Sequence, residues 1–327
     1  MRIAVTGSIA TDHLMTFPGS FAEQLMPDKL DKVALSFLVD TLEIRRGGVA
    51  ANIAFGLGCL GAGPLLIGSA GADFAEYRAW LTSHGVDVSG VRESALHHTA
   101  RFISTTDRRG AHIGSFYPGA MSEDSLIDLA ELTSRTGPVD MVLIGAGDPE
   151  AMLRFTAQCH ELSLPFATDT SWQVARLDGE QVRLLLDGCD YLFANEYEAA
   201  LTEQKTGWSA AEIAKRVRVR ITTLGADGAR VEQIGRPPLR VPALPVQGLT
   251  EPTGAGDAFR AGFLAAIGWG LSLERAAQLG NLIAVCALET VGTQEYELKP
   301  AVVAERLAAA YGPEAAGELT SRLDAAA

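Results

Sequence analysis

The chain has 327 residues, of which 47% are hydrophobic and 20% are charged, and its formal net charge at pH 7 is −13. A chain of this length and composition can bury a large core, which argues against disorder and fits one large α/β domain. The isoelectric point of about 4.9 argues against nucleic acid or an anionic membrane surface as a partner, because both require a basic surface. We therefore expect a small-molecule substrate.

The opening segment, MRIAVTGSIATDHL, is apolar for only a few residues before Asp12 and His13 interrupt it. This pattern fits neither a signal peptide nor a membrane helix, so we expect a cytoplasmic protein. The cysteines occur singly, with no spacing typical of a metal site, and we expect them to be buried free thiols. They are Cys59, Cys159, Cys189 and Cys286.

The N-terminal part predicts strands that interrupt a regular α/β pattern. RIAVTGS (2–8) is expected to be a buried first strand, with Ser8 and Asp12 just beyond it. The segment KVALSFLVDTLEI (32–44), apolar at every second position from Val33 to Val39, predicts a strand with one buried face. TARFISTTD (99–107), which precedes HIGSFYPGAM, is a second such patch. We expect insertions at about 12–45 and 97–118 to form a small β-sheet lid, whose apolar face is covered by substrate or by a second subunit in a homodimer.

The segment RRGGVAANIAFGLGCLGAG (45–63) opens with Gly47 and Gly48 and continues as a helical pattern whose only strongly polar residue is Asn52. The glycines permit a ligand to approach the backbone closely, and Asn52 lies roughly one helical turn beyond them. The alternative is a helix of small residues packed closely on the sheet, with Asn52 hydrogen-bonded to backbone. This segment alone leaves both interpretations open.

From about residue 138 the chain alternates short strands with helices, which is typical of βαβ units and a parallel sheet. The predicted strands DMVLIGAGD, PFATDTS and DYLFANE end in the polar residues Asp148, Asp169 and Asn195. Ligands of doubly wound sheets bind beyond the carboxyl ends of the strands. The predicted fold is therefore a doubly wound, mostly parallel α/β sheet flanked by helices, with a polar ligand edge.

Asn195 and Glu198 in ANEYEAAL also have two interpretations. Asn at the N-cap with Glu three residues later is close to a capping box. Alternatively, the two side chains organise a hydrated magnesium ion, which keeps several waters and few protein ligands.

The segment ITTLGADGARVEQI (221–234) has Asp-Gly between two β-type runs and predicts a hairpin. Thr223 and Gly225 fall at the end of its first run, on the expected ligand edge. Backbone at that place would lie against a nucleotide.

The segment EPTGAGDAFRAGF (251–263) places two glycines and Asp257 before an apolar helical run. In a structural interpretation, Thr253 or Asp257 caps the helix and the glycines form the turn. In a chemical one, the exposed N–H groups hold a phosphate and Asp257 acts as a base. The loop has no lysine, and the chain has no GxxxxGK[ST], HExxH or GxSxG motif and no GxGxxG after its first strand, which argues against P-loop, dinucleotide-binding, metalloprotease and common hydrolase chemistry.

Two of these segments together resemble a known family. GGVAANIAFGLGCLG and PTGAGDAF are similar to the paired signatures of the ribokinase-like (PfkB-type) sugar and nucleoside kinases, and NEYE and TTLGADG lie between them in the family's order. The resemblance covers nearly the whole chain and implies a single kinase domain over residues 1–327. Within the family, TGSIATDHL, SFYPGAMSE, GDAFRAGF and GTQEY look most like bacterial adenosine kinases of the mycobacterial type.

The resemblance implies a role for each matching residue. Asp257 would take the proton from the ribose 5′-hydroxyl, and the N–H groups of Gly254, Ala255 and Gly256 would form an anion hole for the transferred phosphoryl group. The residues implied to bind the nucleoside are Ser8, Asp12, Gly48, Asn52, Phe102, Phe116 and Gln173, with the two phenylalanines sandwiching the base. Those implied to contact ATP are Asn195, Thr223, Gly225, Gly228 and Asn281, with Glu198 serving Mg²⁺.

The implied reaction is the ATP- and Mg²⁺-dependent phosphorylation of adenosine to AMP, a purine-salvage step. The alternatives are the same chemistry on ribose, fructose or a related sugar, and a non-catalytic nucleotide-binding protein on this fold. Paired aromatics favour a flat base, and an intact Asp257 loop favours catalysis. The chain departs from the family pattern at Glu251, where an aspartate usually adjoins a K⁺ site, and at Trp172, where the compared adenosine kinases have a polar amide.

Overall fold

The computed structural model describes residues 1–326 apart from 26–30, 33–34 and 251. Within these residues, nine strands form one sheet in the order β13-β12-β11-β10-β9-β8-β1-β4-β5. Neighbouring strands from β11 to β5 are parallel, and β12 and β13 are antiparallel additions at one edge. The strands are β1 (Ile3–Thr6), β4 (Leu65–Gly71), β5 (Val91–Ser94), β8 (Met141–Ile144), β9 (Phe166–Asp169), β10 (Tyr191–Asn195), β11 (Val219–Thr223), β12 (Ala229–Gln233) and β13 (Leu239–Val241).

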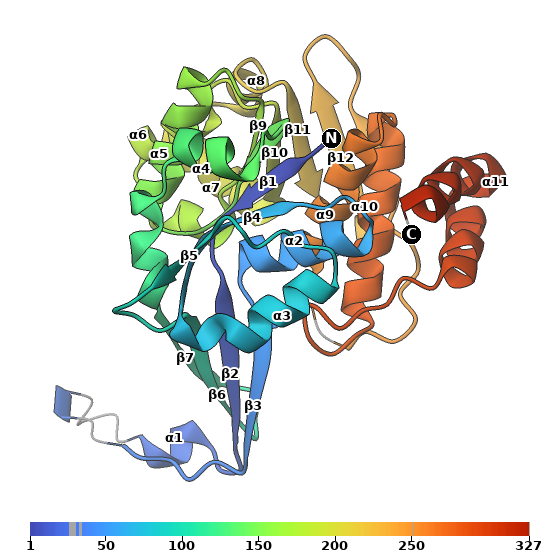
Figure 1. Cartoon of the computed structure of the whole chain (residues 1–327). Helices are drawn as coiled ribbons and strands as arrows, with labels where there is room; N and C mark the ends of the chain where they lie inside the picture. The colour runs from blue at the N-terminus through green and yellow to red at the C-terminus, as the bar shows by residue number, and fades with distance from the viewer. Residues whose placement is uncertain (26–30, 33–34, 251, 327) are drawn as a thin grey trace.

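Helices cover both faces of this sheet, which confirms the predicted α/β class (Figure 1). One core contains Ile3 and Val5 of β1, and the other contains Ala4 between them, so successive side chains enter opposite cores. The first core is covered by α2 (Val49–Cys59), α3 (Ala75–Ser83), α9 (Ala255–Gly268), α10 (Leu273–Leu288) and α11 (Pro300–Ala326). The second is covered by α4 (Leu129–Thr136), α5 (Pro149–Glu161), α6 (Gly179–Leu186), α7 (Glu196–Thr206) and α8 (Ala210–Ile213).

The βαβ elements predicted after residue 138 are confirmed, and local capping explains where their helices begin. The Asp148 side chain accepts a hydrogen bond from the Ala151 N–H at 3.0 Å, and Pro149 occupies the first turn of α5. Asp178 and Gln181 form a reciprocal capping box at the start of α6. Short 3₁₀ helices complete the connections at η2 (Ala72–Phe74), η3 (Gly119–Leu126), η4 (Ser171–Ala175) and η5 (Gly225–Asp227).

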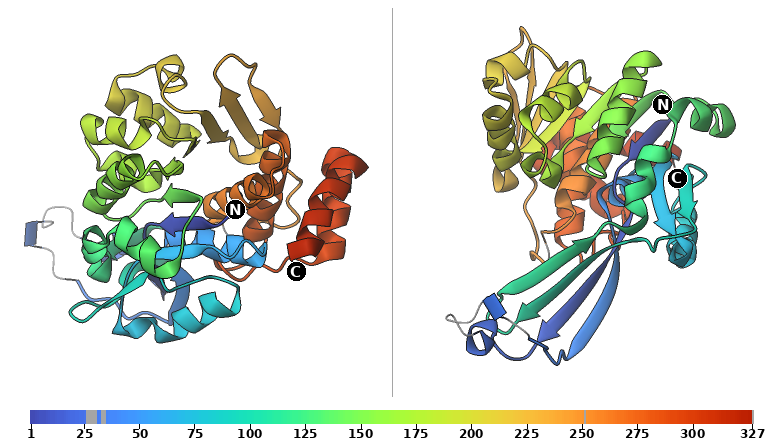
Figure 2. Two further views of the ribbon diagram at one scale, coloured as in Figure 1. Left: turned by 45° about the horizontal axis from the view of Figure 1, so that its top comes forward. Right: turned by 90° about the vertical axis from the view of Figure 1, so that its left-hand side faces the viewer.

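A second, four-stranded sheet projects from the body below the carboxyl ends of the main strands, as the predicted lid (Figures 1 and 2). Its strands, in the order β3-β2-β6-β7, are β2 (Ala10–Phe17), β3 (Thr41–Gly47), β6 (Ala100–Asp107) and β7 (His112–Tyr117).

The strand predicted over residues 32–44 is confirmed only at its C-terminal end, where Thr41–Ile44 belong to β3. The described residues 35–39 have no strand, and β3 begins only at Thr41; Val33 lies outside the described residues. The Phe37 ring instead packs 5.0 Å from the rings of Phe17 and Phe21, beside α1 (Phe21–Gln24). Phe37 therefore belongs to an aromatic cluster at the end of the lid, whereas Leu35 and Leu38 are exposed.

Other global features follow the composition. The cysteines are buried or half-buried free thiols, as expected. The last helix, α11, is broken at Gly312 (φ 87°), directly before Pro313. Among the described residues, no helix combines the length and the apolar composition that crossing a bilayer requires.

Candidate functional site

The site forms where the strand order of the main sheet reverses. β1 lies between β4 and β8, and a ligand crevice opens beyond the carboxyl ends of strands at such a switch point. Gly7 follows β1 with φ 132°, and a side chain there would lie 3.0 Å from the carbonyl oxygen of Ala146. The chain therefore turns tightly into Ser8, the first residue of the site.

A cavity of about 390 Å³, which we call the lid cavity, lies between the lid and this edge of the sheet. The predicted substrate residues that line it are Ser8, Asp12, Gly48, Asn52, Phe102 and Phe116. A neighbouring cavity of about 640 Å³, which we call the loop cavity, is bounded by the glycine loop before α9. The predicted residues that line it are Gly254, Gly256, Asn195, Glu198, Thr223 and Gly225. Asp257 lines both cavities, as do Val49 and Trp172.

Asp257 does not cap its helix. α9 begins after Gly254, which has φ 80°, and among the described residues no side chain caps this end. The expectation that Thr253 or Asp257 supplies a cap is therefore wrong. The Asp257 carboxylate instead accepts a hydrogen bond from Asn52 Nδ2 at 2.9 Å. A helix N-terminus of this kind is chemically suited to an anion.

Small residues bring Asn52 and Asp257 together. α2 packs on α9 so closely that a side chain at Gly56 would lie 2.6 Å from the Ala261 methyl group. The close packing expected of α2 is thus confirmed. The Asn52 side chain, which that interpretation joined to backbone, instead forms hydrogen bonds with the side chains of Asp257, Thr293 and Gln294. At the start of α2, the Ser8 hydroxyl accepts a hydrogen bond from the Val49 N–H at 2.9 Å.

A buried ion pair lies directly behind the glycine loop. Arg260 Nε and Nη2 lie 2.6 and 2.7 Å from the two carboxylate oxygens of Asp169, and the two side chains are 7% and 0% exposed. Glu198 lies 3.9 Å from the same guanidinium. A side chain at Gly256 would lie 2.6 Å from Arg260 Nη1, so a larger residue there would displace the guanidinium.

These groups set the protonation of Asp257. Burial raises the pKa of the Asp257 carboxyl to about 6, against the opposing effects of the Arg260 charge and the Asn52 hydrogen bond. Burial likewise raises the pKa of Asp169 to about 7, although Arg260 counteracts it. A carboxylate with a pKa near neutrality, at the junction of two cavities, is suited to accept a proton.

The two aromatic rings of the lid lie side by side and do not face each other. Phe102 and Phe116 are direct cross-strand partners and lie on the same face of the sheet. The ring that faces Phe116 from the main domain is Trp172, at a centroid distance of 5.7 Å and an angle of 54°. A base therefore cannot lie between the two phenylalanine rings as predicted, because both rings are on one face of the lid, with Trp172 beside them.

Four predicted residues lie outside the lining of both cavities: Ala255, Gln173, Gly228 and Asn281. Gln173 is buried, and its amide donates to the Gly147 carbonyl. At Gly228, φ is 90° and a side chain would lie 2.1 Å from the Val241 carbonyl oxygen, so glycine is required by the close approach to β13. Asn281 Nδ2 donates to the Pro242 carbonyl at 3.0 Å and contacts the Tyr311 hydroxyl at 3.2 Å.

Asn195 and Glu198 form the predicted capping box at the start of α7, with both reciprocal hydrogen bonds at 2.8 Å. Both residues also line the loop cavity, so capping does not remove them from the site. Among the described residues, no group of three or more His, Cys, Asp or Glu side chains could hold a metal. This donor set fits Mg²⁺ only in its usual nucleotide-bound form, with phosphate oxygens and water as most of the ligands.

Sequence reasoning missed several residues of the site. Thr253 and Thr293 line the lid cavity, and Arg260 lines the loop cavity. Arg260 was detectable, because it follows Asp257 by nearly one turn on the same helix. Thr293 stands in GTQEY, a segment that the resemblance already included, although no role was given to this threonine. Glu251, on which the K⁺ expectation depends, lies outside the described residues.

Comparison with known proteins agrees with this geometry. The profile of the pfkB family carbohydrate kinases matches residues 9–300. The nucleoside kinase of Methanocaldococcus jannaschii is 27% identical over 295 residues, which cover 90% of this chain and 92% of that protein. The structure of Burkholderia thailandensis nucleoside kinase with inosine matches with a TM-score of 0.83 and 31% identity, over 95% of this chain and 99% of that chain; another structure of that enzyme holds ADP and inosine. The adenosine kinase of Schizosaccharomyces pombe is 28% identical over 164 residues, or 44% of this chain and 47% of that protein.

Proposed function

Since this chain belongs to the pfkB family of carbohydrate kinases, we propose that it transfers the γ-phosphoryl group of ATP to the 5′-hydroxyl of a purine nucleoside, with adenosine as the preferred acceptor. Its membership and its relatives make the chain a nucleoside or sugar kinase of this family. The observation that carries the proposed phosphoryl transfer is the place of Asp257 at the junction of the lid cavity and the loop cavity. One carboxylate can therefore meet an acceptor hydroxyl in one cavity and face the phosphoryl donor in the other.

The proposed reaction uses groups that are already in position. Asp257 accepts the proton of the acceptor hydroxyl as that oxygen forms its bond to the γ-phosphorus and the bond to the ADP oxygen breaks. The N–H groups of Gly254, Ala255 and Gly256 stabilise the negative charge on the transferred group. Arg260 adds a fixed positive charge behind this loop. Mg²⁺, when bound with the nucleotide, neutralises phosphate charge, and Glu198 is the residue that would orient its water ligands.

The lid cavity supports a nucleoside over a free sugar. Asp12 and Asn52 offer polar groups suited to ribose hydroxyls, whereas Phe102, Phe116 and Trp172 provide apolar ring surface. A sugar alone would leave that surface uncovered, while a purine would cover it. The relative of known structure binds inosine, which is also a purine nucleoside.

The test is a screen for ADP release with adenosine, inosine, guanosine, ribose and fructose as acceptors. We expect adenosine to give the highest kcat/KM, and ³¹P NMR of the product to show a 5′-phosphomonoester. Activity with ribose but with no nucleoside would refute the nucleoside assignment. Activity confined to inosine or guanosine would refute only the preference for adenosine.

We also propose that the lid pairs with that of a second copy. Leu42, Ile44 and Ile113 are 57%, 62% and 49% exposed. The strand registers place them on the face opposite to Phe102. Burying such a patch would favour a homodimer. Sedimentation equilibrium should give a dimer for the unaltered chain and a monomer for Ile44→Glu; a monomer for both would refute the pairing.

A further inference from the structure

A chain of hydrogen bonds behind Asn52 connects Asp257 to the base of the lid. Asn52 Nδ2 donates to Asp257, and Asn52 Oδ1 accepts from Gln294 Nε2 at 2.9 Å. The same Gln294 nitrogen donates to the Tyr77 hydroxyl, which donates to the Gly47 carbonyl at 2.9 Å. Gln294 is 1% exposed and belongs to the loop that follows α10.

The direction of every bond in this chain is determined by its two ends. The ionised carboxylate of Asp257 and the carbonyl of Gly47 can only accept hydrogen bonds. A chain between two acceptors needs one member that donates in both directions. Asn52 and Tyr77 each accept on one side and donate on the other, so that member is the Gln294 NH₂ group. Gln294 therefore makes Asn52 turn its NH₂ group, not its carbonyl oxygen, toward Asp257.

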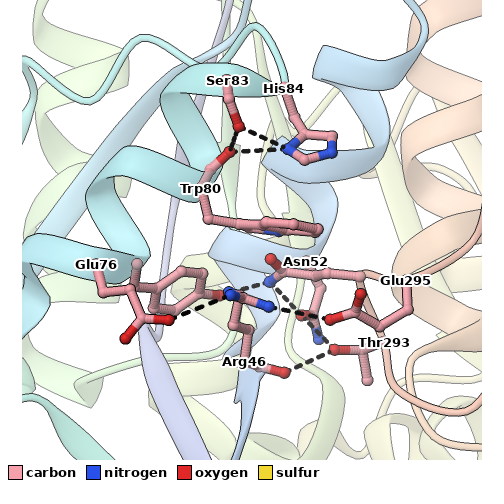
Figure 3. A network of polar contacts seen from close by, with 10 residues as sticks. Arg46, Asn52, Glu76, Trp80, Ser83, His84, Thr293 and Glu295 are labelled. Atoms are coloured by element: carbon pink, nitrogen blue, oxygen red, sulfur yellow. Dashed lines mark hydrogen bonds and ion pairs between the residues drawn. The ribbon is translucent and has the colours of Figure 1, made fainter.

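Thr293 cannot replace Gln294 in this role. Its hydroxyl oxygen lies 2.9 Å from Asn52 Oδ1 and 3.0 Å from the Arg46 carbonyl oxygen, and both of these atoms are acceptors (Figure 3). A hydroxyl group has a single hydrogen and serves one of them at a time. The Arg46 backbone is itself held in place, since its guanidinium lies 3.0 Å from Glu295 and 4.0 Å from the centre of the Trp80 ring.

We propose that Gln294 is a positioning residue for phosphoryl transfer, which acts through Asn52 to hold the Asp257 carboxylate in the orientation that meets the acceptor hydroxyl. This inference rests on the proposed function, because it takes Asp257 to be the proton acceptor. The Asn52 hydrogen bond also lowers the pKa of Asp257 and so favours its ionised form. The other charged groups that face Asp257 are Arg260 on its own helix, Glu198 on α7 and Asp169 on β9.

The test compares Gln294→Met with Tyr77→Phe in the full chain. Gln294→Met keeps the length of the side chain but removes both donors. Tyr77→Phe removes the bonds to Gln294 and Gly47 but leaves the bond from Gln294 to Asn52. We expect kcat to fall about 10- to 100-fold in Gln294→Met, because a misplaced catalytic group costs rate more than binding, with the KM for ATP nearly unchanged. Tyr77→Phe should keep most of its kcat.

The pH profile separates positioning from a structural role. In Gln294→Met the acidic limb of kcat should move to higher pH, because the Asn52 amide no longer has a fixed orientation toward Asp257. Unchanged kcat and an unchanged limb in folded Gln294→Met would overturn the inference. If that variant does not fold, Gln294→Glu is the second test, because it keeps the shape of the side chain but can only accept hydrogen bonds once it is ionised. Its kcat should fall as the pH rises. A kcat that rises with pH, as we expect for the unaltered chain, would overturn the inference. An unaltered chain without kinase activity would refute the proposed function instead.

Discussion

The lid cavity and the loop cavity meet at Asp257 but are lined by different kinds of side chain. The lid cavity is lined by the rings of Phe102, Phe116 and Trp172 and, besides Asp257, by the carboxylate of Asp12. The loop cavity presents a helix N-terminus, Glu198 and the buried Arg260. The first is therefore suited to select a ligand by shape and ring surface, whereas the second is suited to stabilise a transferred phosphoryl group with fixed charge. Changes in the two cavities should accordingly affect different kinetic constants.

The sharpest test of this division is Asp257→Asn, at the junction. We expect kcat to fall about 10²- to 10⁴-fold, because the variant loses the proton acceptor. The fold should persist, since an asparagine at 257 still accepts from Asn52 and no cap is lost. Steady-state kinetics and thermal melting measure the two effects.

The matched control is Asp148→Asn, at the N-cap of α5. It should leave kcat unchanged, because it concerns an aspartate at another helix start. A fully active Asp257→Asn would refute the assignment of the base. An unfolded Asp257→Asn would show that the residue is needed for the helix start.

Because Arg260 is the buried partner of Asp169 beside the loop cavity, Arg260→Met should destabilise the fold strongly. Removal of the arginine leaves Asp169 buried and unpaired, which should lower the free energy of unfolding by about 3–5 kcal/mol. Neutralising both partners in Asp169→Leu/Arg260→Met should restore most of that loss while kcat stays low. Urea denaturation measures the stabilities.

Lys299→Met is the control for this variant, because Lys299 and Glu297 form an exposed pair at 3.5 Å. Lys299→Met should lower the free energy of unfolding by only about 0–1 kcal/mol. A double variant that is stable and fully active would show that the Arg260 charge is structural only.

The fold was predictable because its signals are local. Buried runs such as the one that forms β1, and caps such as Asp148, act within a few residues of the element that they define. The failure at residues 33–39 arose because the partners of Phe37 are rings of the preceding segment, Phe17 and Phe21. Alternation of apolar residues cannot distinguish a strand face from contributions to such a cluster.

The site was predictable only in part, for a related reason. Asn52 and Asp257 stand in short motifs, but the partners that hold them are distant in sequence: Asp169 is 91 positions from Arg260, and Gln294 is 242 positions from Asn52. Gly228 was placed at the nucleotide by resemblance, whereas the approach of Val241 explains it. Resemblance of motifs does not reveal which backbone packs against a glycine.

The lid side of the comparison is tested by Phe102→Ala. If the ring stacks on the base, adenosine binding should weaken by about 1–3 kcal/mol. ATP binding should hardly change, because Phe102 does not line the loop cavity. Isothermal titration with each ligand separates the two, and Phe17→Leu in the aromatic cluster at the end of the lid serves as the control for lid stability. Equal losses for both ligands would place the ring elsewhere.

The smallest expected effect is the pH dependence of the junction itself. The pKa of Asp257 is raised to about 6, so the base is mostly ionised at pH 7 and becomes protonated as the pH falls through that value. Below it, kcat should fall roughly tenfold per pH unit, because only the ionised carboxylate accepts a proton. The KM for ATP should change little over the same range, since the N–H groups that we propose to bind phosphate do not titrate. The kcat is measured only at pH values where thermal melting shows the chain to be folded. If it stays constant from pH 7 to pH 5, Asp257 is not the group that accepts the proton.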